Sequence, residues 1–461
     1  MQSIHFIGIG GTAMAGAAFL ARERGLVVRG SDQNLYPPTV DELRAGKIPF
    51  TEGYAAENLA YQPDLVVLGN AISRGNPELE EALDRRLRIL SLPEFIAEYV
   101  IGSRPSYVIA GTHGKTTTTA LIAHVLRHNG IDAGFMVGGV AENFERSATI
   151  GSDAFVIEGD EYDTSIFDPR SKFLLYRPTH VIINNIEFDH ADIFADLAAV
   201  EATFARLVKI IPRNGLLVTN ADNPSCMKLA AQAKTRVVTF GEGSSADLRL
   251  TGVSHGDKTE IRFLNRGHEL TLSSPLRGKH NALNTLAAYA LLEHRELLQD
   301  GWQRGLDTFQ GVKRRLQVRL ENTAVTVLED FAHHPTAIRA NLETLRELYP
   351  GRRLVVLIEP RSNTMVRNFF QQKLVEALAT ADVVFSDAIY RAEKYAEAER
   401  LDLNRLKADL EAKNKEVWLL PAQDRAVFVT EKLRPKDLVC FMTNGSFSGL
   451  IGEVVAALSR H

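Results

Sequence analysis

Residues 107–130 read YVIAGTHGKTTTTALIAHVLRHNG: a short apolar run, a glycine-rich turn and a helical stretch. The run Tyr107–Ala110 predicts a buried strand, and the residues after Lys115 predict a helix that Gly130 ends. In the turn between them, backbone N–H groups and Lys115 could hold phosphates, and the Thr116 hydroxyl could ligate Mg²⁺. Two residues separate the glycines instead of the four of the common phosphate-binding loop. The flanking strand and helix nevertheless favour nucleotide binding. The turn comprises Gly111, Thr112, His113, Gly114, Lys115, Thr116 and Thr117.

Acidic residues follow two other predicted strands. The run Ala154–Ile157 leads into EGDEYD (158–163), and residues 181–184 lead into NIEFDH (185–190). Ligands of open α/β sheets collect at the carboxyl ends of the strands, so we expect both clusters beside the glycine-rich turn. Mg²⁺ prefers one or two carboxylates together with phosphates and water, which suits Glu158. His190 could be a metal ligand, a substrate anchor or a packed histidine.

A second glycine-rich turn lies near the start of the chain. Ser3–Ile7 predicts a strand, and residues 8–13 (GIGGTA) match the pattern G-x-G-x-x-A before a predicted helix. Asp32 lies about twenty residues farther on, where a dinucleotide-binding fold places its acid. Such a turn lets backbone N–H groups and a helix N-terminus approach a diphosphate. A nicotinamide cofactor, another nucleotide diphosphate and a purely structural turn remain open as alternatives.

Apolar runs alternate with helical stretches along the whole chain, which predicts an α/β fold with parallel sheets and crossover helices. Residues 236–275 differ, because short alternating runs with turn residues favour antiparallel strands there. A chain of 461 residues is too long for one core. We predict three domains, at residues 1–103, 104–313 and 314–461.

The composition excludes several classes of protein. The formal net charge is −4, so no global positive field attracts nucleic acid or a membrane surface. Cys226 and Cys440 are the only cysteines, which excludes a disulfide framework and is typical of a reducing cytoplasm. No apolar stretch approaches the roughly 20 residues of a membrane helix. We expect a cytoplasmic protein, a monomer or weak homodimer, with small-molecule partners and neither nucleic acid nor membrane partners.

Together these pieces resemble the Mur ligase family, the ATP-dependent amide-forming enzymes of peptidoglycan metabolism. The resemblance extends over nearly the whole chain and rests on GIGGTAM (8–14), GTHGKTTTTA (111–120), EGDEYD (158–163), NNIEFDHAD (184–192), GKHNALN (278–284), GVKRR (311–315) and EDFAHHPTAI (329–338). It implies a three-domain architecture, with a Rossmann-like N-terminal domain that binds a UDP-sugar, a central P-loop ATPase domain and an α/β C-terminal domain that binds a peptide.

The resemblance also implies roles for individual residues. Lys115, Glu158 and His190 would be catalytic, and Thr116, Glu158 and His190 would hold Mg²⁺. ATP would contact the 111–117 turn together with Asn281, Asn284, Arg315 and Asp330. The substrate-binding residues would be Gly8, Gly10, Gly11, Thr12, Ala13, Asp32, Ala71 and Ile72 on the UDP-sugar side and His333, His334, Arg361, Ser362 and Asn363 on the peptide side. Several family members carry a carbamylated lysine at the position of Ala205, so metal coordination without that group is expected here.

Four segments distinguish the branches of the family: EYDTSIFDPRSKF (161–173), FDHADIF (188–194), EPRSNTM (359–365) and TNGSFSG (443–449). They resemble the branch that joins the murein tripeptide L-alanyl-γ-D-glutamyl-meso-diaminopimelate to UDP-N-acetylmuramate in peptidoglycan recycling. That reaction would consume ATP and pass through an acyl phosphate. The main alternative is the branch that adds L-alanine to UDP-N-acetylmuramate. An NAD-dependent oxidoreductase and a non-catalytic ATP-binding protein are more distant alternatives.

Overall fold

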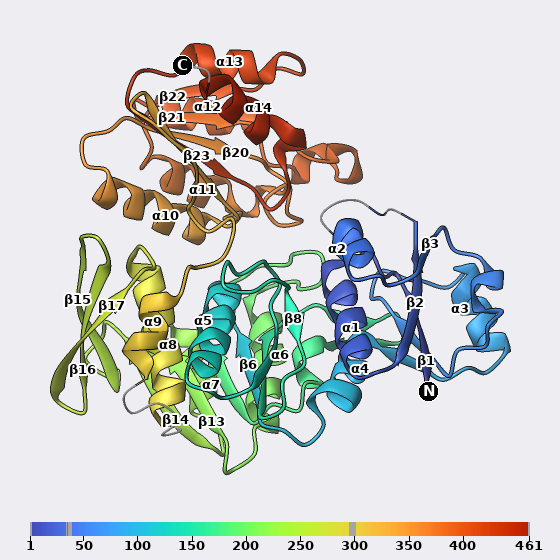
Figure 1. Cartoon of the computed structure of the whole chain (residues 1–461). Helices are drawn as coiled ribbons and strands as arrows, with labels where there is room; N and C mark the ends of the chain where they lie inside the picture. The colour runs from blue at the N-terminus through green and yellow to red at the C-terminus, as the bar shows by residue number, and fades with distance from the viewer. Residues whose placement is uncertain (1, 34, 36–38, 295–300, 460–461) are drawn as a thin grey trace.

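The N-terminal part of the chain forms a parallel sheet with the strand order β3-β2-β1-β4-β5 (Figure 1). The computed structural model describes residues 2–33, 35, 39–294 and 301–459, and every statement on its elements concerns these residues. The strands are β1 (Ser3–Ile7), β2 (Val27–Asp32), β3 (Phe50–Glu52), β4 (Leu65–Leu68) and β5 (Ile89–Ser91). The helices are α1 (Thr12–Glu23), α2 (Thr39–Ala45), α3 (Pro77–Asp84) and α4 (Leu92–Phe95). Register pairs such as Phe6 with Gly30 and Phe6 with Val67 put β1 between β2 and β4, so its carboxyl end and the turn after it lie at mid-sheet.

The central part contains a larger sheet with the order β17-β16-β15-β14-β13-β12-β6-β9-β7-β8. Its strands are β6 (Ser106–Ala110), β7 (Ala133–Met136), β8 (Ala148–Thr149), β9 (Ala154–Gly159), β12 (His180–Ile183), β13 (Leu216–Asn220), β14 (Arg236–Gly241), β15 (Leu248–His255), β16 (Thr259–Asn265) and β17 (His268–Ser274). A separate hairpin pairs β10 (Asp163–Ser165) with β11 (Asp168–Ser171). The helices are α5 (Lys115–His128), α6 (Leu197–Ile210), α7 (Pro224–Ala230), α8 (Lys279–His294) and α9 (Trp302–Thr308).

The C-terminal part has its own sheet, in the order β18-β19-β23-β20-β21-β22. Its strands are β18 (Gln317–Glu321), β19 (Val325–Asp330), β20 (Leu354–Ile358), β21 (Val383–Ser386), β22 (Glu416–Leu419) and β23 (Asp437–Met442), and only β18 among them runs antiparallel to its neighbour. The helices are α10 (Pro335–Leu348), α11 (Gln371–Leu378), α12 (Leu403–Glu411), α13 (Arg425–Lys432) and α14 (Leu450–Leu458). All three sheets are thus mainly parallel, as the alternating pattern predicted.

One prediction about the central sheet is partly wrong. The short alternating runs of residues 236–275 predicted antiparallel strands, but β14 pairs parallel with both β13 and β15. Within residues 236–275, the β15–β16 and β16–β17 pairs are antiparallel, and they extend the edge of the same sheet. Gly241 and the turn residues after it resemble a hairpin in the sequence, whereas residues 242–247 connect two strands that pair parallel.

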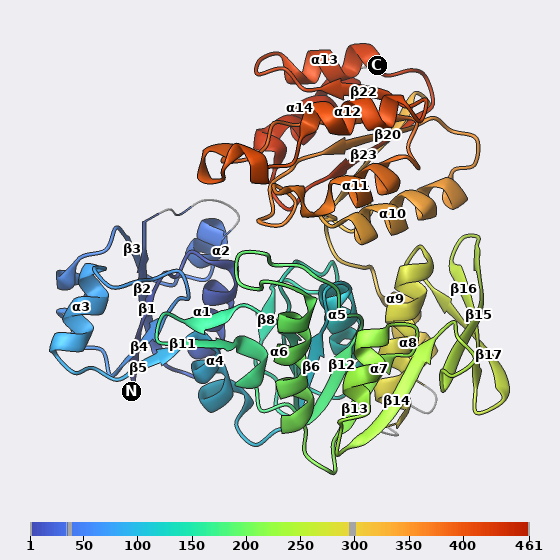
Figure 2. The ribbon, with the colours of Figure 1, turned by 180° about the vertical axis from the view of Figure 1, so that it is seen from behind.

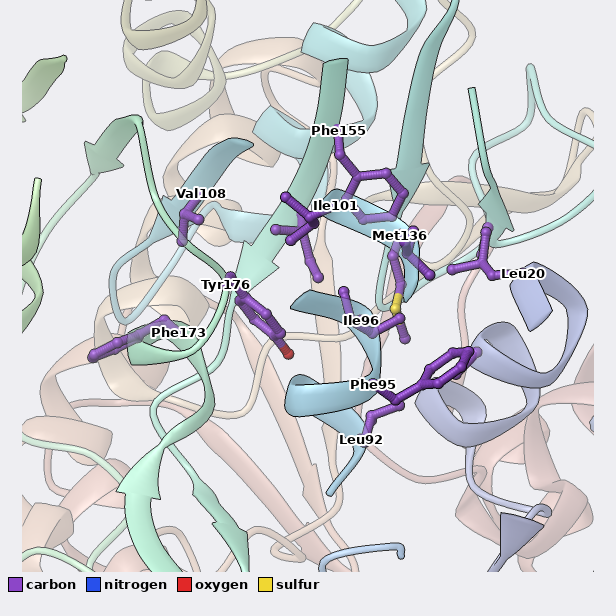
Figure 3. Packing of buried hydrophobic residues seen from close by; sticks show 14 of the residues in the cluster. Leu20, Leu92, Phe95, Ile96, Ile101, Val108, Met136, Phe155, Phe173 and Tyr176 are labelled. Atoms are coloured by element: carbon purple, nitrogen blue, oxygen red, sulfur yellow. The ribbon is translucent and has the colours of Figure 1, made fainter. Parts of the chain in front are cut away.

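The N-terminal and central domains share one hydrophobic cluster (Figure 3). Phe95 and Ile96 lie where α4 continues into the π-helix η2 (Ile96–Ile101), and both are fully buried. Around them are Leu20 from α1 and Phe155 from the central sheet. This continuous packing fixes the N-terminal domain beside the central one.

The C-terminal domain lies against the central domain in both views of the ribbon, and one connection, between α9 and β18, joins them (Figures 1 and 2). Its core consists of two apolar clusters, one on each side of its sheet, that are separate from those of the other domains. Its contacts with the central domain include the packing of α10 against α8 and hydrogen bonds such as that from Asn363 to Asp192. Among the described residues, no helix combines the length and the apolar character needed to cross a membrane.

Candidate active site

The central glycine-rich turn leaves the carboxyl end of β6 and starts α5. Gly111 has φ +125° and Gly114 has φ +84°, conformations that L side chains rarely adopt. A Cβ at Gly111 would lie 2.9 Å from the carbonyl oxygen of Asn185. The same asparagine holds the turn, because its side-chain oxygen accepts the backbone N–H of His113 at 2.8 Å. The turn thus lies at the carboxyl ends of β6 and β12, and α5 begins directly after it.

Lys115 lies inside this turn and is paired with an acid. Its Nζ donates to the carbonyl oxygen of Gly111 at 2.7 Å and lies 3.2 Å from both carboxylate oxygens of Glu161. Burial would lower the pKa of Lys115, but the carboxylates of Glu161 and Asp160 outweigh it and raise the pKa. Lys115 is therefore a fixed positive charge at the N-terminus of α5, a kind of position that favours anions.

Thr116 and Glu158 present oxygen atoms next to Lys115. The Thr116 hydroxyl donates to Glu158 Oε2 at 3.1 Å, and the guanidinium of Arg315 reaches the Thr116 oxygen at 3.3 Å. Burial raises the pKa of Glu158, while a hydrogen bond from Gly138 and the charge of Lys115 act in the opposite direction. Hydroxyl and carboxylate oxygens are among the ligands that Mg²⁺ prefers, so Thr116 and Glu158 fit this ion.

His190 faces the same group from the loop after β12. Its Nε2 lies 3.0 Å from Glu161 Oε1, and its Nδ1 lies 3.0 Å from the hydroxyl oxygen of Tyr162. Burial alone would lower the pKa of His190, but the hydrogen bond and charge of Glu161 raise it. Glu161 therefore connects Lys115 to His190, and the four side chains Lys115, Glu158, Glu161 and His190 form one cluster.

The other predicted ATP contacts surround the turn. Asn281 and Asn284 are buried on one face of α8, and Asn284 Nδ2 donates to Asn281 Oδ1 at 3.2 Å. Thr117 is buried in the first turn of α5. Asp330 is 3% exposed at the end of β19, where its oxygens accept the backbone N–H groups of Leu316 and Ala332 at 2.7 Å each. In this structure Asp330 therefore fixes the chain beside Arg315.

A second group of possible metal ligands lies on the other side of the turn. One ligand atom each from His113, Glu187 and His334 lies within 4.8 Å of the others. Thr336 already donates its hydroxyl to Glu187 Oε2 at 2.6 Å and its backbone N–H to His334 Nδ1 at 3.3 Å. Burial lowers the pKa of His334 to about 4, so its ring is neutral at neutral pH. We interpret this group as a polar contact between the P-loop and the C-terminal domain.

The remaining peptide-side residues follow β19 and β20. His333 donates from Nδ1 to the carbonyl oxygen of Phe331 at 2.9 Å. The guanidinium of Arg361 stacks on Tyr390, 3.8 Å from the ring centre, and its Nη1 lies 3.3 Å from Glu359. Ser362 accepts the backbone N–H of Met365, and Asn363 donates to Asp192 of the central domain at 2.8 Å. The loop after β20 therefore lies next to the loop that carries His190.

The N-terminal turn forms its own site. Asp32 Oδ2 accepts the backbone N–H of Gly10 at 2.8 Å, and Gly8 has φ +88° and lies against Ile72. Gly11 immediately precedes α1. Thr12, Ala13 and Ala71 are exposed beside this turn. Asp32 thus reaches the turn from β2, as the spacing of the motif predicted.

Sequence reasoning missed the two carboxylates that organise the cluster, Glu161 and Asp189. Asp189 is 6% exposed and accepts a hydrogen bond at 2.7 Å from Thr364 of the C-terminal domain. Both acids stand inside motifs that were recognised, EGDEYD and NIEFDH. Their place in those motifs was a signal that they belong to the site. It did not reveal their partners, Lys115 for Glu161 and Thr364 for Asp189, which lie far away in the sequence.

Family models match the chain in three successive ranges: the Mur ligase family catalytic domain at residues 3–104, the Mur ligase middle domain at 109–292 and the Mur ligase glutamate ligase domain at 314–445. The chain belongs to the Mur ligase family. The predicted three-domain Mur ligase fold is confirmed by these matches and by the solved structure described next.

Three relatives illustrate the similarity. The UDP-N-acetylmuramate–L-alanyl-γ-D-glutamyl-meso-2,6-diaminoheptandioate ligase of Haemophilus influenzae is 36% identical over 99% of each chain. A UDP-N-acetylmuramate–L-alanine ligase of Anaeromyxobacter dehalogenans is 34% identical over 99% of this chain and 98% of its own. The crystal structure of a murein peptide ligase from Psychrobacter arcticus is 33% identical, covers 100% of this chain and 99% of its own, and superposes with a TM-score of 0.73.

Proposed function

We propose that this Mur ligase joins UDP-N-acetylmuramate to the tripeptide L-alanyl-γ-D-glutamyl-meso-diaminopimelate with consumption of ATP, in peptidoglycan recycling. The observation that carries the proposal is the cluster at the carboxyl ends of β6 and β9, in which Lys115 pairs with Glu161 and the Thr116 hydroxyl meets Glu158 and Arg315. Full-length similarity to a ligase named for this tripeptide supports the choice of substrate.

The three domains divide the work in this proposal. Residues 1–103 bind the UDP-sugar through the turn of Gly8, Gly10, Gly11, Thr12 and Ala13 together with Asp32, Ala71 and Ile72. Residues 104–313 bind ATP through residues 111–117, Asn281 and Asn284, with Arg315 and Asp330 contributed from beyond the domain boundary. Residues 314–461 bind the peptide through His333, His334, Arg361, Ser362 and Asn363.

The first chemical step would transfer the γ-phosphoryl group of ATP to the lactyl carboxylate and give an acyl phosphate. This step brings an anion up to a polyanion. Two unit charges 4 Å apart repel by about 4 kcal/mol at an effective dielectric constant near 20, or roughly three decades in rate. Lys115 and Arg315 would cancel much of this repulsion. Thr116 and Glu158 would hold Mg²⁺, which offsets further phosphate charge, and His190 would complete the metal site.

In the second step the free amine of the L-alanyl residue would attack the acyl phosphate, and phosphate would leave. An α-amine has a reference pKa of about 8, so about a tenth of it is neutral at about pH 7. A weak base is therefore sufficient. Positioning of the amine beside the activated carboxyl group supplies the larger part of the acceleration.

A substrate panel tests the assignment. The full-length protein, UDP-N-acetylmuramate and ATP are incubated with the tripeptide, with L-alanine or with no amine, and ADP release is measured. We expect the tripeptide to give the highest kcat/KM. A clear preference for L-alanine would replace the tripeptide assignment by the L-alanine ligase assignment, and no ADP release with either amine would refute the ligase proposal. In parallel, oxygen-18 placed in the lactyl carboxyl group should appear in the released phosphate.

A further inference from the structure

The loop that carries His190 is held from the C-terminal domain. Thr364 Oγ1 donates to Asp189 Oδ1 at 2.7 Å, and the same oxygen accepts the backbone N–H of His190 at 2.7 Å. Asp189 is 6% exposed and Thr364 is 2% exposed, so water competes little for this contact. One carboxylate oxygen therefore connects the C-terminal domain to the residue whose imidazole faces Glu161.

Neighbouring contacts repeat the connection. Asn363 donates to Asp192 at 2.8 Å, and Arg367 donates to the carbonyl oxygen of Ala191 at 3.1 Å. At the other end of the loop, Phe188 packs edge-on against Phe369, with ring centres 5.7 Å apart. The whole loop 188–192 thus lies against one segment, residues 363–370, which follows β20.

The backbone of this loop depends on such support. His190 has φ +53°, in the left-handed region that residues other than glycine rarely occupy. A strained conformation of this kind persists where the surroundings determine it. The Asp189 carboxylate, held by Thr364 and bonded to the N–H of His190, is a buried contact that stabilises it.

We propose that Thr364 is a positioning residue for the catalytic cluster: docking of the C-terminal domain brings its hydroxyl to Asp189 and thereby sets His190 against Glu161. The inference rests on the proposed ligase function, in which His190 belongs to the catalytic centre. Arg361, Ser362 and Asn363 directly precede Thr364, so the segment that would bind the peptide is the one that holds the catalytic loop. Peptide binding and assembly of the cluster are thereby coupled.

Two substitutions at position 364 separate hydrogen bonding from packing. Thr364→Val keeps the branched shape but removes the hydroxyl, which donates to Asp189 and accepts the backbone N–H of Ala191 at 3.3 Å, whereas Thr364→Ser keeps it. A hydrogen bond to a charged group contributes enough that its loss lowers kcat roughly ten- to hundredfold in Thr364→Val. We expect Thr364→Ser to restore most of kcat, and the KM for ATP to stay within about twofold in both, because the P-loop contacts are untouched. Thr430→Val is the matched control, since among the described residues the Thr430 hydroxyl bonds only to the carbonyl oxygens of Ala426 and Val427 in its own helix.

A double-mutant cycle asks whether Thr364 acts through Asp189. If it does, Thr364→Val lowers kcat much less when added to Asp189→Ala, which removes the accepting oxygen, than when added to the wild type. Full additivity of the two effects would overturn the inference, because it would mean that Thr364 acts by another route.

Hydrogen exchange in the full-length protein provides a readout that needs no turnover. With an ATP analogue and UDP-N-acetylmuramate present, we expect the amides of residues 188–194 to exchange faster in Thr364→Val than in the wild type or in Thr430→Val. This result stands even where the substrate panel shows no ligase activity, so the two proposals fail separately. Unchanged exchange in Thr364→Val, or a Thr364→Ser variant as impaired as Thr364→Val, would overturn the positioning role.

Discussion

The two glycine-rich turns of this Mur ligase share a backbone plan and differ in charge. Each follows the carboxyl end of a strand inside a parallel sheet and starts a helix, α1 or α5. Residues 8–13 contain no charged side chain. The carboxylate of Asp32 contacts this turn, because it accepts the backbone N–H of Gly10. The central turn contains Lys115 and lies against Arg315, Glu158 and Glu161.

This difference matches the two tasks that we propose. A diphosphate that is only held can be bound by backbone N–H groups and a helix N-terminus. A triphosphate whose terminal group is transferred needs cations at the place where charge moves. The central turn also contacts the C-terminal domain through Arg315, so its electrostatics depend on how the domains sit together.

The largest expected effect comes from removing the cation of the central turn. Lys115→Ala should lower kcat for ADP release by about a thousandfold, because the repulsion between carboxylate and phosphate then lacks its main counter-charge. The affinity for UDP-N-acetylmuramate, measured by calorimetry, should stay within about threefold if the two turns bind separate ligands. Lys228→Ala is the control, since Lys228 forms an exposed ion pair with Glu201 on α6. Turnover of Lys115→Ala within tenfold of the wild type would argue against Lys115 as a phosphate ligand.

A pair of glycine substitutions compares the backbones of the two turns. Gly114 has φ +84°, and an added Cβ would lie 2.3 Å from Asn284 Oδ1. Gly11 has φ −70°, and the nearest atom to an added Cβ is 3.9 Å away. Gly114→Ala should therefore lower the free energy of unfolding by about 2 kcal/mol, and Gly11→Ala by less than about 0.5 kcal/mol, in urea titrations. Equal losses would mean that the central turn relaxes easily and is not the more constrained of the two.

The central turn should also carry an acid-sensitive contribution to stability. Burial acts to raise the pKa of Glu187, but the hydrogen bond and charge of His113 outweigh it, and the pKa falls to about 2. Since this value lies below the ordinary one of about 4.3, the contribution is complete above about pH 4.3 and is lost as the pH falls toward 2. The unfolding free energies of wild type and Glu187→Gln should differ by on the order of 2 kcal/mol near pH 6, with allowance for a side chain that is 30% exposed. The difference should disappear near pH 2; a difference that grows on acidification would reverse the assigned sign.

Local pattern was enough to predict much of this site. The turn at 111–117, the strand before it and the helix after it are decided by neighbouring residues, because glycine conformation and apolar periodicity act over a few positions. The same holds for Asp32, whose distance from the first turn is set by one strand-helix-strand unit. The acids of EGDEYD were expected at the edge of the sheet for the same reason.

The roles that escaped prediction depend on contacts between distant parts of the chain. Glu161 pairs with Lys115 because β9 lies next to β6, and Asp189 meets Thr364 because the C-terminal domain docks there. Nothing in the sequence near Thr364 marks its hydroxyl as a donor to another domain. Asp330 stays a predicted ATP contact, and its buried oxygens also accept two backbone N–H groups, which the motif did not indicate.

The smallest expected effect concerns the acid of the first turn. Asp32→Asn keeps an oxygen that can accept from Gly10 but loses the charge that would hold a ribose hydroxyl, a change worth about 1 kcal/mol. We expect the KM for UDP-N-acetylmuramate to rise about fivefold while the KM for ATP stays the same. Glu52→Gln, at the end of β3 and in register with Asp32, is the control for a general loss of negative charge. A fall in the KM for UDP-N-acetylmuramate would show instead that Asp32 repels the diphosphate, and the first turn would then share the charge sensitivity that distinguishes the second.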